Sequence, residues 1–259
     1  EGEKHDTAET MDLGRWEAGG ISVVSEDGST SVENGKLKLV CGEDGACDLI
    51  LANGEVAVRR AWSQVDYRVG DAEKSFAARS LDGAPVALAA RAEQTALGGC
   101  VVLEMKAVRS GAPTLVTQMR VYEDGRFVTV DLQVRNDLEE AVELSKMSPW
   151  IAGAKEQGGL FVGADPKDHG VLDNGQMRFL DFAAALHHGL STTVSNWSAA
   201  IVDRTSGEGV VAGALSMEHS LPVVTVRNTG IKGLTDEATG RLGFAEISLD
   251  TLYSPRKPV

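Results

Sequence analysis

The stretch LVTQMRVYEDGRFVTVDLQVR, from Leu115 to Arg135, decides the fold class. In its second part, apolar residues occupy every other position from Val128 to Val134, and polar residues lie between them. A period of two is typical of a strand with one buried and one exposed face. The first part alternates in the same way, and the Glu-Asp-Gly sequence at 123–125 supplies a turn. The stretch therefore predicts a β-hairpin.

The same alternation recurs along most of the chain. It predicts further strands over Glu55–Val65, Pro85–Glu93, Cys100–Val108, Ala141–Met147, Trp197–Asp203, Gly209–Leu215, Val223–Val226 and Gly243–Leu252. Turns rich in Gly, Asn and Asp separate these segments, a spacing that favours sandwiches over parallel units. We expect an all-β fold, a large antiparallel β-sandwich formed by residues 13–259 as one domain. Residues 1–12 are polar and lack periodicity, which predicts a loose N-terminal arm.

Helix is expected at one place at most. The segment Asp181–His188 begins with an N-cap residue and is followed by Gly189, where a helix-ending glycine belongs. It covers only about two turns. No segment keeps a helical pattern long enough for a β-α-β crossover, which excludes a Rossmann fold or a (β/α) barrel.

Composition narrows the classes of partner. The 259 residues are 42% hydrophobic and 24% charged, as in ordinary globular proteins, and the formal net charge is −13. Binding a phosphate backbone requires clustered Lys and Arg, so we expect no nucleic-acid partner. The longest apolar runs are only a few residues, far below the roughly 20 that a membrane-spanning helix needs. The sequence does not begin with Met, and we expect a processed or engineered start.

Two cysteines flank a turn-like loop. Cys41 and Cys47 lie between the strand-like stretches Lys36–Val40 and Asp48–Leu51, so their side chains can meet across a hairpin. A disulfide there would suit an oxidising compartment, and an extracytoplasmic or secreted location is therefore favoured. The alternative is a pair of unpaired thiols in a cytosolic protein, and the odd third cysteine, Cys100, leaves both readings open.

No motif supplies self-sufficient chemistry. The sequence lacks a Gly-x-Gly-x-x-Gly, a phosphate loop, a Gly-x-Ser-x-Gly elbow and a His-Glu-x-x-His, so we expect no cofactor, and no spacing indicates a metal site. His187 and His188 are interpreted as a solvated helix end. Glu218 and His219 place a carboxylate beside an imidazole, as sugar-epimerising enzymes require, and form the one alternative catalytic pair.

The tryptophans are candidates for stacking on sugar rings. Trp62 and Trp197 lie in strand-like runs and are interpreted as core residues. Trp150 follows Ser148-Pro149 at the end of a predicted strand, which makes it the best exposed candidate.

Three segments, in order, resemble a known family. The run from Thr114 to Trp150, the segment VLDNGQMRFLDF at Val171–Phe182 and the block SNWSAAIVDRTSGEGVVAGALS at Ser195–Ser216 are similar to the N-terminal β-supersandwich of glycoside hydrolase family 36. This family contains α-galactosidases and raffinose-synthase-like enzymes. The resemblance covers roughly residues 100–250 and rests on the order of the segments. Phe179 stands where the family has a tryptophan.

The resemblance implies a galactose-mutarotase-like supersandwich without catalytic residues of its own. In that family, two carboxylates about 5 Å apart are carried by a (β/α) barrel that follows the sandwich. The chain would then be an accessory domain that packs on a catalytic barrel, and Trp150, Asn174 and Phe179 would be its sugar-contacting residues. Two alternatives remain: a free-standing carbohydrate-binding or structural protein of an extracellular assembly, with its oligomeric state open, and a mutarotase-like enzyme using Glu218 and His219.

Overall fold

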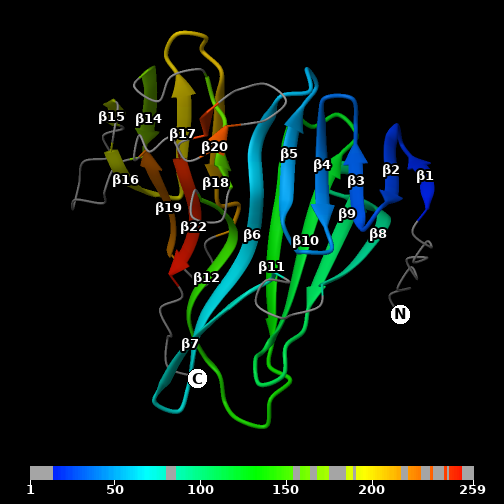
Figure 1. Ribbon diagram of the computed structural model, residues 1–259, viewed down its shortest axis with the longest axis vertical. Helices are drawn as coiled ribbons and strands as arrows, with labels where there is room; N and C mark the ends of the chain where they lie inside the picture. The colour runs from blue at the N-terminus through cyan, green and yellow to red at the C-terminus, as the bar shows by residue number, and fades with distance from the viewer. Residues whose placement is uncertain are drawn as a thin grey trace.

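The computed structural model is all-β, and every strand pairing in it is antiparallel (Figure 1). It describes residues 14–79, 86–153, 158–163, 168–174, 185–188, 191–216, 221–228, 234–235, 242–243 and 245–252. No helix in this part of the chain is long and apolar enough to cross a membrane. The expected arm at residues 1–12 lies outside the described residues. The antiparallel all-β fold class predicted from the alternation is confirmed.

Twelve strands form one large sheet. Along its main path the order is β1 (Arg15–Ala18), β2 (Ile21–Glu26), β3 (Ser29–Glu33), β4 (Leu37–Gly42), β5 (Cys47–Leu51), β6 (Val56–Val69), β12 (Glu143–Ala152), β22 (Ala245–Leu252), β19 (Leu221–Asn228) and β16 (Ser191–Asn196). Two strands lie off this path: β7 (Ala72–Ala77) pairs with β6, and β13 (Gly159–Leu160) pairs with both β6 and β22. Strand β6 is thus shared by the two halves of the sheet.

Two four-stranded sheets and one short ribbon complete the fold. The first small sheet has the order β11 (Val128–Arg135), β10 (Thr114–Tyr122), β9 (Gly98–Ala107) and β8 (Val86–Thr95). The second small sheet has the order β15 (Ala185–His188), β14 (His169–Asp173), β17 (Ser198–Asp203) and β18 (Gly209–Gly213). A two-stranded ribbon pairs β20 (Leu234–Thr235) with β21 (Leu242–Gly243).

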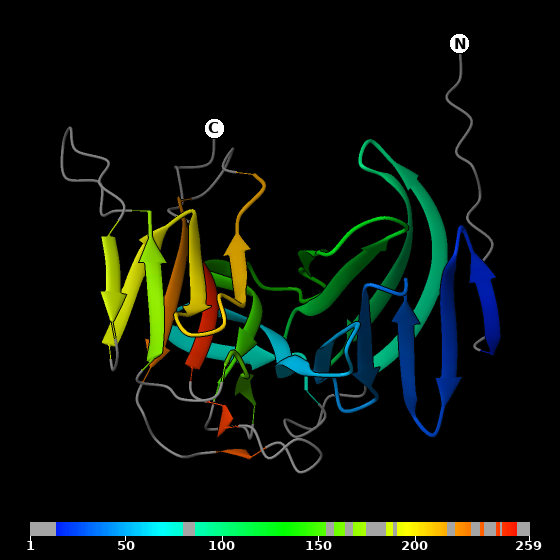
Figure 2. The same cartoon turned by 90° about the horizontal axis from the view of Figure 1, so that it is seen from above.

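Both small sheets lie on the same side of the large sheet, as the view from above shows (Figure 2). One core, around Leu39, Leu103 and Met119, fills the space between β2–β5 and the first small sheet. A second core, around Val58, Ile201 and Val224, fills the space under the second small sheet. Leu49 on β5 packs against both cores, so they are neighbours on one face. The layers are those of a sandwich.

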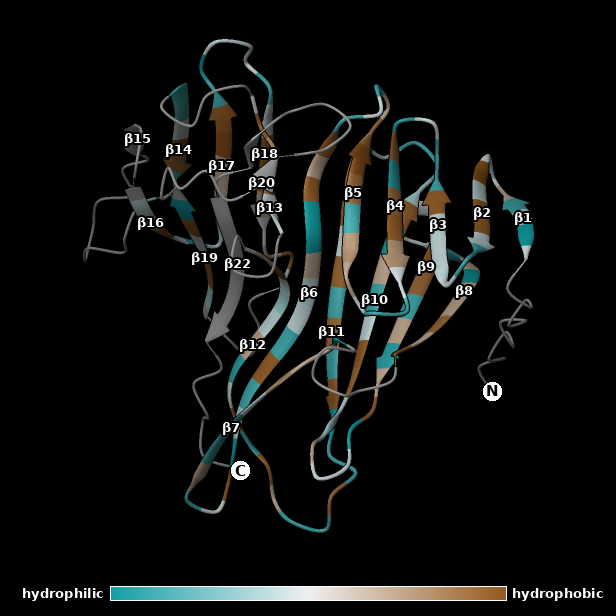
Figure 3. Cartoon of the chain, in the orientation of Figure 1, coloured by the Kyte–Doolittle hydropathy of each residue, from teal (hydrophilic) through white to brown (hydrophobic). Residues whose placement is uncertain are grey.

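The predicted hairpin forms as β10 and β11. Its register pairs Val121 with Val128 and Thr114 with Arg135, with the turn at residues 123–127 between the strands. Apolar and polar residues alternate along β11 in the hydropathy view (Figure 3). Because the side-chain period is two, one set of residues faces the core and the other faces outward.

A β-bulge interrupts β6 where it passes β5. Arg60 has a φ of 49°, in the left-handed region, and the register between the two strands shifts around it. The backbone N–H of Arg60 donates to Asp48 Oδ1 (2.7 Å), and its guanidinium lies 2.8 Å from Asp44 Oδ2. These two carboxylates therefore satisfy polar groups at a backbone conformation that a non-glycine residue rarely adopts.

The helix predicted over Asp181–His188 is wrong in the part that the structure describes. Residues 185–188 form strand β15, which pairs with β14 and places His188 opposite Gly170 and His187 opposite Val171. An isolated two-turn helix gains too few hydrogen bonds to offset its nucleation cost. Pairing with a neighbouring strand provides those hydrogen bonds instead.

Cys41 and Cys47 are opposite one another on β4 and β5, and the structure joins them by a disulfide. Their Cα atoms are 4.2 Å apart, the spacing of a pair in which the two residues do not exchange backbone hydrogen bonds. Both side chains are fully buried, and Cys47 Sγ contacts Met105 Sδ on the first small sheet (3.6 Å). Of the two alternatives that the sequence left open, the structure has the hairpin disulfide.

Candidate functional site

Two of the three sugar-contacting residues expected from the sequence, Trp150 and Asn174, lie in the described part of the chain. Trp150 on β12 is half-buried and packs against the core beneath the second small sheet. Asn174 follows β14, where its backbone N–H donates to Ser195 Oγ (2.7 Å). Phe179, Glu218 and His219 lie outside the described residues.

The two tryptophans interpreted as core residues behave differently. Trp62 is buried beside Ile151 on the outer side of β6, and the Arg79 guanidinium stacks on its ring at 4.6 Å. Trp197 is only half-buried and has a φ of 67° between β16 and β17, where the chain passes from the large sheet to the second small sheet. The interpretation is correct for Trp62 and only partly correct for Trp197.

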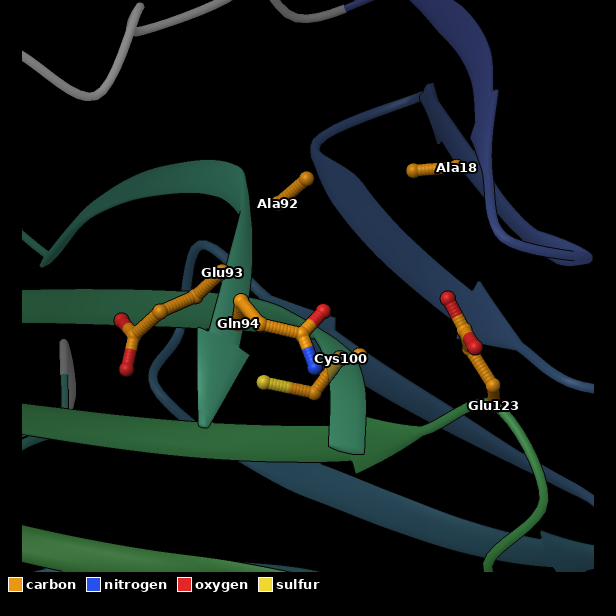
Figure 4. A pocket seen from close by; sticks show the side chains of 7 residues that line it. Ala18, Ala92, Glu93, Gln94, Cys100 and Glu123 are labelled. Carbon is orange, nitrogen blue, oxygen red and sulfur yellow. The ribbon is translucent and has the colours of Figure 1, made fainter. Parts of the chain in front are cut away.

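Two adjoining hollows lie at one end of the first small sheet. The first, of about 270 Å³, is bounded by Ala18, Ala92, Glu93, Gln94, Gly99, Cys100 and Glu123 (Figure 4). The second, of about 230 Å³, is bounded by Leu97, Gly98, Gly99, Tyr122, Glu123, Asp124, Gly125 and Phe127. Gly99 and Glu123 border both, so the two hollows are neighbours. We call the pair the Glu123 hollow.

Strand pairing brings these residues together from distant parts of the chain. Cys100 on β9 lies opposite Glu93 on β8 and Tyr122 on β10. The turn after β10 then places Glu123 beside the β8–β9 hairpin, where its backbone N–H donates to Gly99 O (3.1 Å). Figure 4 shows Gln94 and Cys100 between Glu93 on one side and Glu123 on the other.

The Glu123 carboxylate lies directly against two glycines. A Cβ atom added at either Gly99 or Gly19 would overlap Glu123 Oε1. Gly19 also has a φ of 56°, which favours glycine for a second reason. The absence of side chains at these two positions is what lets the carboxylate occupy this place.

The carboxylates of the hollow differ in their ion pairing. Glu93 lies 3.4 Å from both Arg91 Nη2 and Arg120 Nε, and Asp124 lies 3.4 Å from Lys36 Nζ. Among the residues that the structure describes, no cation pairs with Glu123. Glu123 itself is exposed to solvent.

Cys100 lines the hollow as a buried free thiol. Its side chain is almost fully buried, and burial raises the pKa of its thiol, with the nearby Glu93 carboxylate acting in the same direction. Only the thiolate is a good nucleophile or metal ligand, so burial disfavours the reactive form of Cys100. Within the described ranges, no three His, Cys, Asp or Glu side chains are grouped so that they could hold a metal ion.

An exposed aromatic ring adds an apolar surface to the hollow. The Phe127 side chain is 46% exposed, and its ring packs on the Tyr122 ring at 5.0 Å between centroids, tilted by 33°. Tyr122 is buried and its hydroxyl is hydrogen-bonded to Thr129 Oγ1 (3.1 Å), which fixes the supporting ring. Carboxylates, an amide and an aromatic ring together can bind hydroxyl groups on one side of a ligand and an apolar face on the other.

Sequence reasoning assigned Glu123 to a turn and gave Phe127 no role. A signal was nevertheless present, because a large aromatic residue two positions after a Glu-Asp-Gly turn is not needed by the turn itself. The contribution of Glu93 and Gly19 could not be seen, because only strand pairing brings them to this position.

No protein-family model matches the chain, and no curated protein matches it. The chain is an all-β protein of antiparallel sheets, arranged as a β-sandwich.

Proposed function

We propose that this chain is a non-catalytic carbohydrate-binding β-sandwich that accompanies a glycoside hydrolase, as the resemblance to the family 36 supersandwich implies. The observation that carries the binding function is the Glu123 hollow, in which an exposed Phe127 ring adjoins an unpaired carboxylate. Sugar rings present an apolar face of C–H groups and a rim of hydroxyls, which suits this combination.

The hollow favours binding over catalysis. A retaining glycosidase needs one carboxylate free to act as nucleophile and a second free to exchange a proton, held about 5 Å apart. Here Glu93 is committed to ion pairs with Arg91 and Arg120. Asp124, the other carboxylate beside Glu123, is an exposed turn residue that pairs with Lys36.

The accessory role is a separate part of the proposal. A catalytic (β/α) barrel would supply the chemistry that the sandwich lacks, and this chain would pack against it. Sequencing the gene beyond Val259 tests this part. About 300 residues of alternating strands and helices would support it, and a stop codon directly after Val259 would contradict it.

Binding is tested by titrating the purified chain with neutral and charged oligosaccharides in calorimetry, alongside Phe127→Ala. Loss of a stacked ring should weaken binding by roughly 5- to 10-fold, the equivalent of about 1 to 1.5 kcal/mol. Leu215→Ala, at another exposed apolar residue, is the matched control and should leave affinity unchanged.

Trp150→Ala separates this site from the one expected from the sequence. If Trp150→Ala abolishes binding and Phe127→Ala does not, the sugar site lies near β12 and the assignment to the Glu123 hollow is wrong. If no oligosaccharide binds the native chain at millimolar concentration, the binding function itself is wrong.

A further inference from the structure

We infer that Asn34 is a modification site: its side-chain amide clasps the two layers of the sandwich together, and loss of that amide by deamidation releases the β10–β11 turn. Asn34 follows β3 and precedes Gly35, in the turn that leads into β4 of the large sheet. The two residues that its amide nitrogen binds lie 88 and 91 positions later in the chain, at the end of β10 and in the turn after it. The contact therefore joins the large sheet to the first small sheet.

All four hydrogen-bonding positions of the Asn34 amide are occupied. Its nitrogen donates to Tyr122 O (2.6 Å) and Gly125 O (2.7 Å), and its oxygen accepts from the backbone N–H groups of Lys36 (2.9 Å) and Leu37 (3.0 Å). A side-chain amide has two donors and can accept two hydrogen bonds, so this one is saturated. The side chain is buried, which makes the loss of any of these partners unfavourable.

The Asn34-Gly35 sequence is chemically suited to deamidation, because glycine has no side chain to block the approach of its backbone nitrogen. In this reaction the nitrogen of Gly35 attacks the side-chain carbonyl carbon of Asn34 and ammonia leaves, which closes a cyclic imide. Water then opens the imide to aspartate or isoaspartate. The reaction requires no oxidant, reductant or enzyme.

The fold delays this reaction at Asn34. To close the ring, the side chain must turn away from its four partners, so only molecules in which the clasp is locally open can react. Asn53-Gly54, in the turn between β5 and β6, provides a comparison: the Asn53 side chain is exposed, and its oxygen accepts from the backbone N–H of Glu55 (3.0 Å). Asn34 should therefore lose its amide more slowly than Asn53, although both precede glycine.

Deamidation replaces an attraction by a repulsion. An ionised aspartate at position 34 has no N–H groups, so a carboxylate oxygen would face the carbonyl oxygens of Tyr122 and Gly125. Two buried acceptors would lose their donors, and a charge would be buried beside them. The hydrogen bond that Lys36 Nζ donates to Asp124 O (2.7 Å) is exposed to solvent and contributes little to holding the turn. The β10–β11 turn is then released from the large sheet.

The first test is peptide mapping by mass spectrometry of the native chain, aged in mildly alkaline buffer with and without concentrated urea. In urea, Asn34 and Asn53 should lose their amides at similar rates, because each precedes glycine in an unfolded chain. In the folded chain, Asn34 should react more slowly than Asn53 by roughly 10-fold. Equal rates at the two positions in the folded chain would overturn the inference.

Asn34→Asp reproduces the product and tests the release of the turn. Hydrogen exchange followed by mass spectrometry should show faster exchange at residues 123–127 and no change in β14 and β17 of the second small sheet. Asn53→Asp makes the same change in an exposed turn and should leave exchange at residues 123–127 as in the native chain. Asn34→Ala removes the amide without burying a charge, and it replaces the aspartate variant if that variant does not fold. Native exchange rates at residues 123–127 in the folded variant would contradict the release.

The release also reaches the proposed sugar site. Tyr122, Gly125 and Phe127 border the Glu123 hollow, so a freed turn changes its wall. This part rests on the proposed function, and calorimetry with an oligosaccharide that the native chain binds tests it. Asn34→Ala should weaken binding by roughly 10-fold, because the turn is no longer positioned in advance, and Asn53→Ala should not.

The outcomes separate the clasp from the proposed function. Unchanged affinity in Asn34→Ala overturns the link between the clasp and the hollow. Absence of binding by the native chain overturns the proposed function, and the deamidation and exchange measurements then decide the clasp alone.

Discussion

The two small sheets cover the same face of the large sheet, yet their outer faces are opposite in character. On the first small sheet, ion pairs run across the strands: Arg91 with Glu104, and Arg120 with both Glu93 and Asp131. On the second small sheet, the residues of β14, β17 and β18 that face away from the core carry no charge. They are Gly170, Leu172, Ser198, Ala200, Val202, Gly209, Val211 and Gly213.

The middle of each inner face is apolar in both sheets, although the second sheet also buries His169, Asp173 and Asp203 at its strand ends. Leu103 and Met119 under the first sheet, and Val171 and Ile201 under the second, are all almost fully buried. Burial of apolar surface drives the inner pattern in both cases, whereas folding places little constraint on the outer pattern. The comparison teaches that the inner faces carry the stability and that the outer faces are free to differ.

The largest expected effect is on the free energy of unfolding, when a buried aliphatic side chain is removed from the inner face of either small sheet. Leu103→Ala and Ile201→Ala each remove a buried aliphatic side chain and should each lower the free energy of unfolding by about 3 kcal/mol. Urea denaturation followed by circular dichroism measures both. A loss below about 1 kcal/mol at Ile201 alone would mean that the second small sheet is loosely packed.

The disulfide distinguishes the first half of the sandwich from the second. Replacing Cys41 and Cys47 together by Ala should cost about 2 kcal/mol, because a short cross-link restricts the unfolded chain. Guanidinium denaturation with and without a reducing agent measures it. The Cys100→Ala variant keeps the bridge and should remain sensitive to the reducing agent, whereas the double variant should not.

The ion pairs on the first small sheet should contribute less. Arg120→Met keeps much of the side-chain packing and removes contacts with Glu93 and Asp131, at an expected cost of about 1 kcal/mol. Thermal denaturation at low and high salt measures it, and the difference should narrow in high salt. Lys38→Met, from the more exposed pair with Glu33, should have no measurable effect, and a loss equal to that of Arg120→Met would contradict the ranking.

Two carboxyl groups, the half-buried Asp48 and the buried Asp203, predict pH effects of opposite sign. Burial raises the pKa of Asp48, so its contribution to stability is present below the unfolded pKa and is lost as pH rises through the folded one. The hydrogen bond from Ser206 lowers the pKa of Asp203, so its contribution is present above the unfolded pKa and is lost as pH falls through the folded one.

Substitution by Asn separates these two groups. Relative to the native chain, Asp48→Asn should gain stability between about pH 3 and pH 7, and Asp203→Asn should lose it over the same range. Denaturant unfolding at the two pH values gives the sign directly. The same sign for both variants would contradict the assigned causes.

The smallest effect is expected on the uncharged outer face. Val211 is 76% exposed, so Val211→Lys should change the free energy of unfolding by less than about 0.5 kcal/mol. Thermal denaturation measures it. A loss of several kcal/mol would mean that this face is covered in solution, and the contrast between the two outer faces would then need another explanation.

Local pattern was sufficient wherever a segment's neighbour in space was also its neighbour in sequence. The hairpin of β10 and β11 and the pairing of Cys41 with Cys47 each depend on one turn, and the alternation around that turn specifies which residues face each other. The segment Asp181–His188 was predicted wrongly because its capping residues favour a helix locally, whereas its described part gains backbone hydrogen bonds by pairing with β14.

The candidate site shows the same limit. Alternation placed Glu93 and Cys100 on strands, and the turn at Glu123 was identified, but nothing in the sequence indicated that these residues adjoin Gly19. The bulge at Arg60 was also not foreseen, since its left-handed backbone depends on carboxylates from another strand.

The sequence by itself determined that the protein is built of antiparallel strands, where most of them run and which residues of each strand face the core. The tertiary structure alone decided that β6 is shared by both halves, that two small sheets cover one large sheet and that the Glu123 hollow exists. The physical reason is that side-chain period is a local property, whereas a strand's hydrogen-bonding partner is chosen by burial and backbone pairing between segments far apart in the chain.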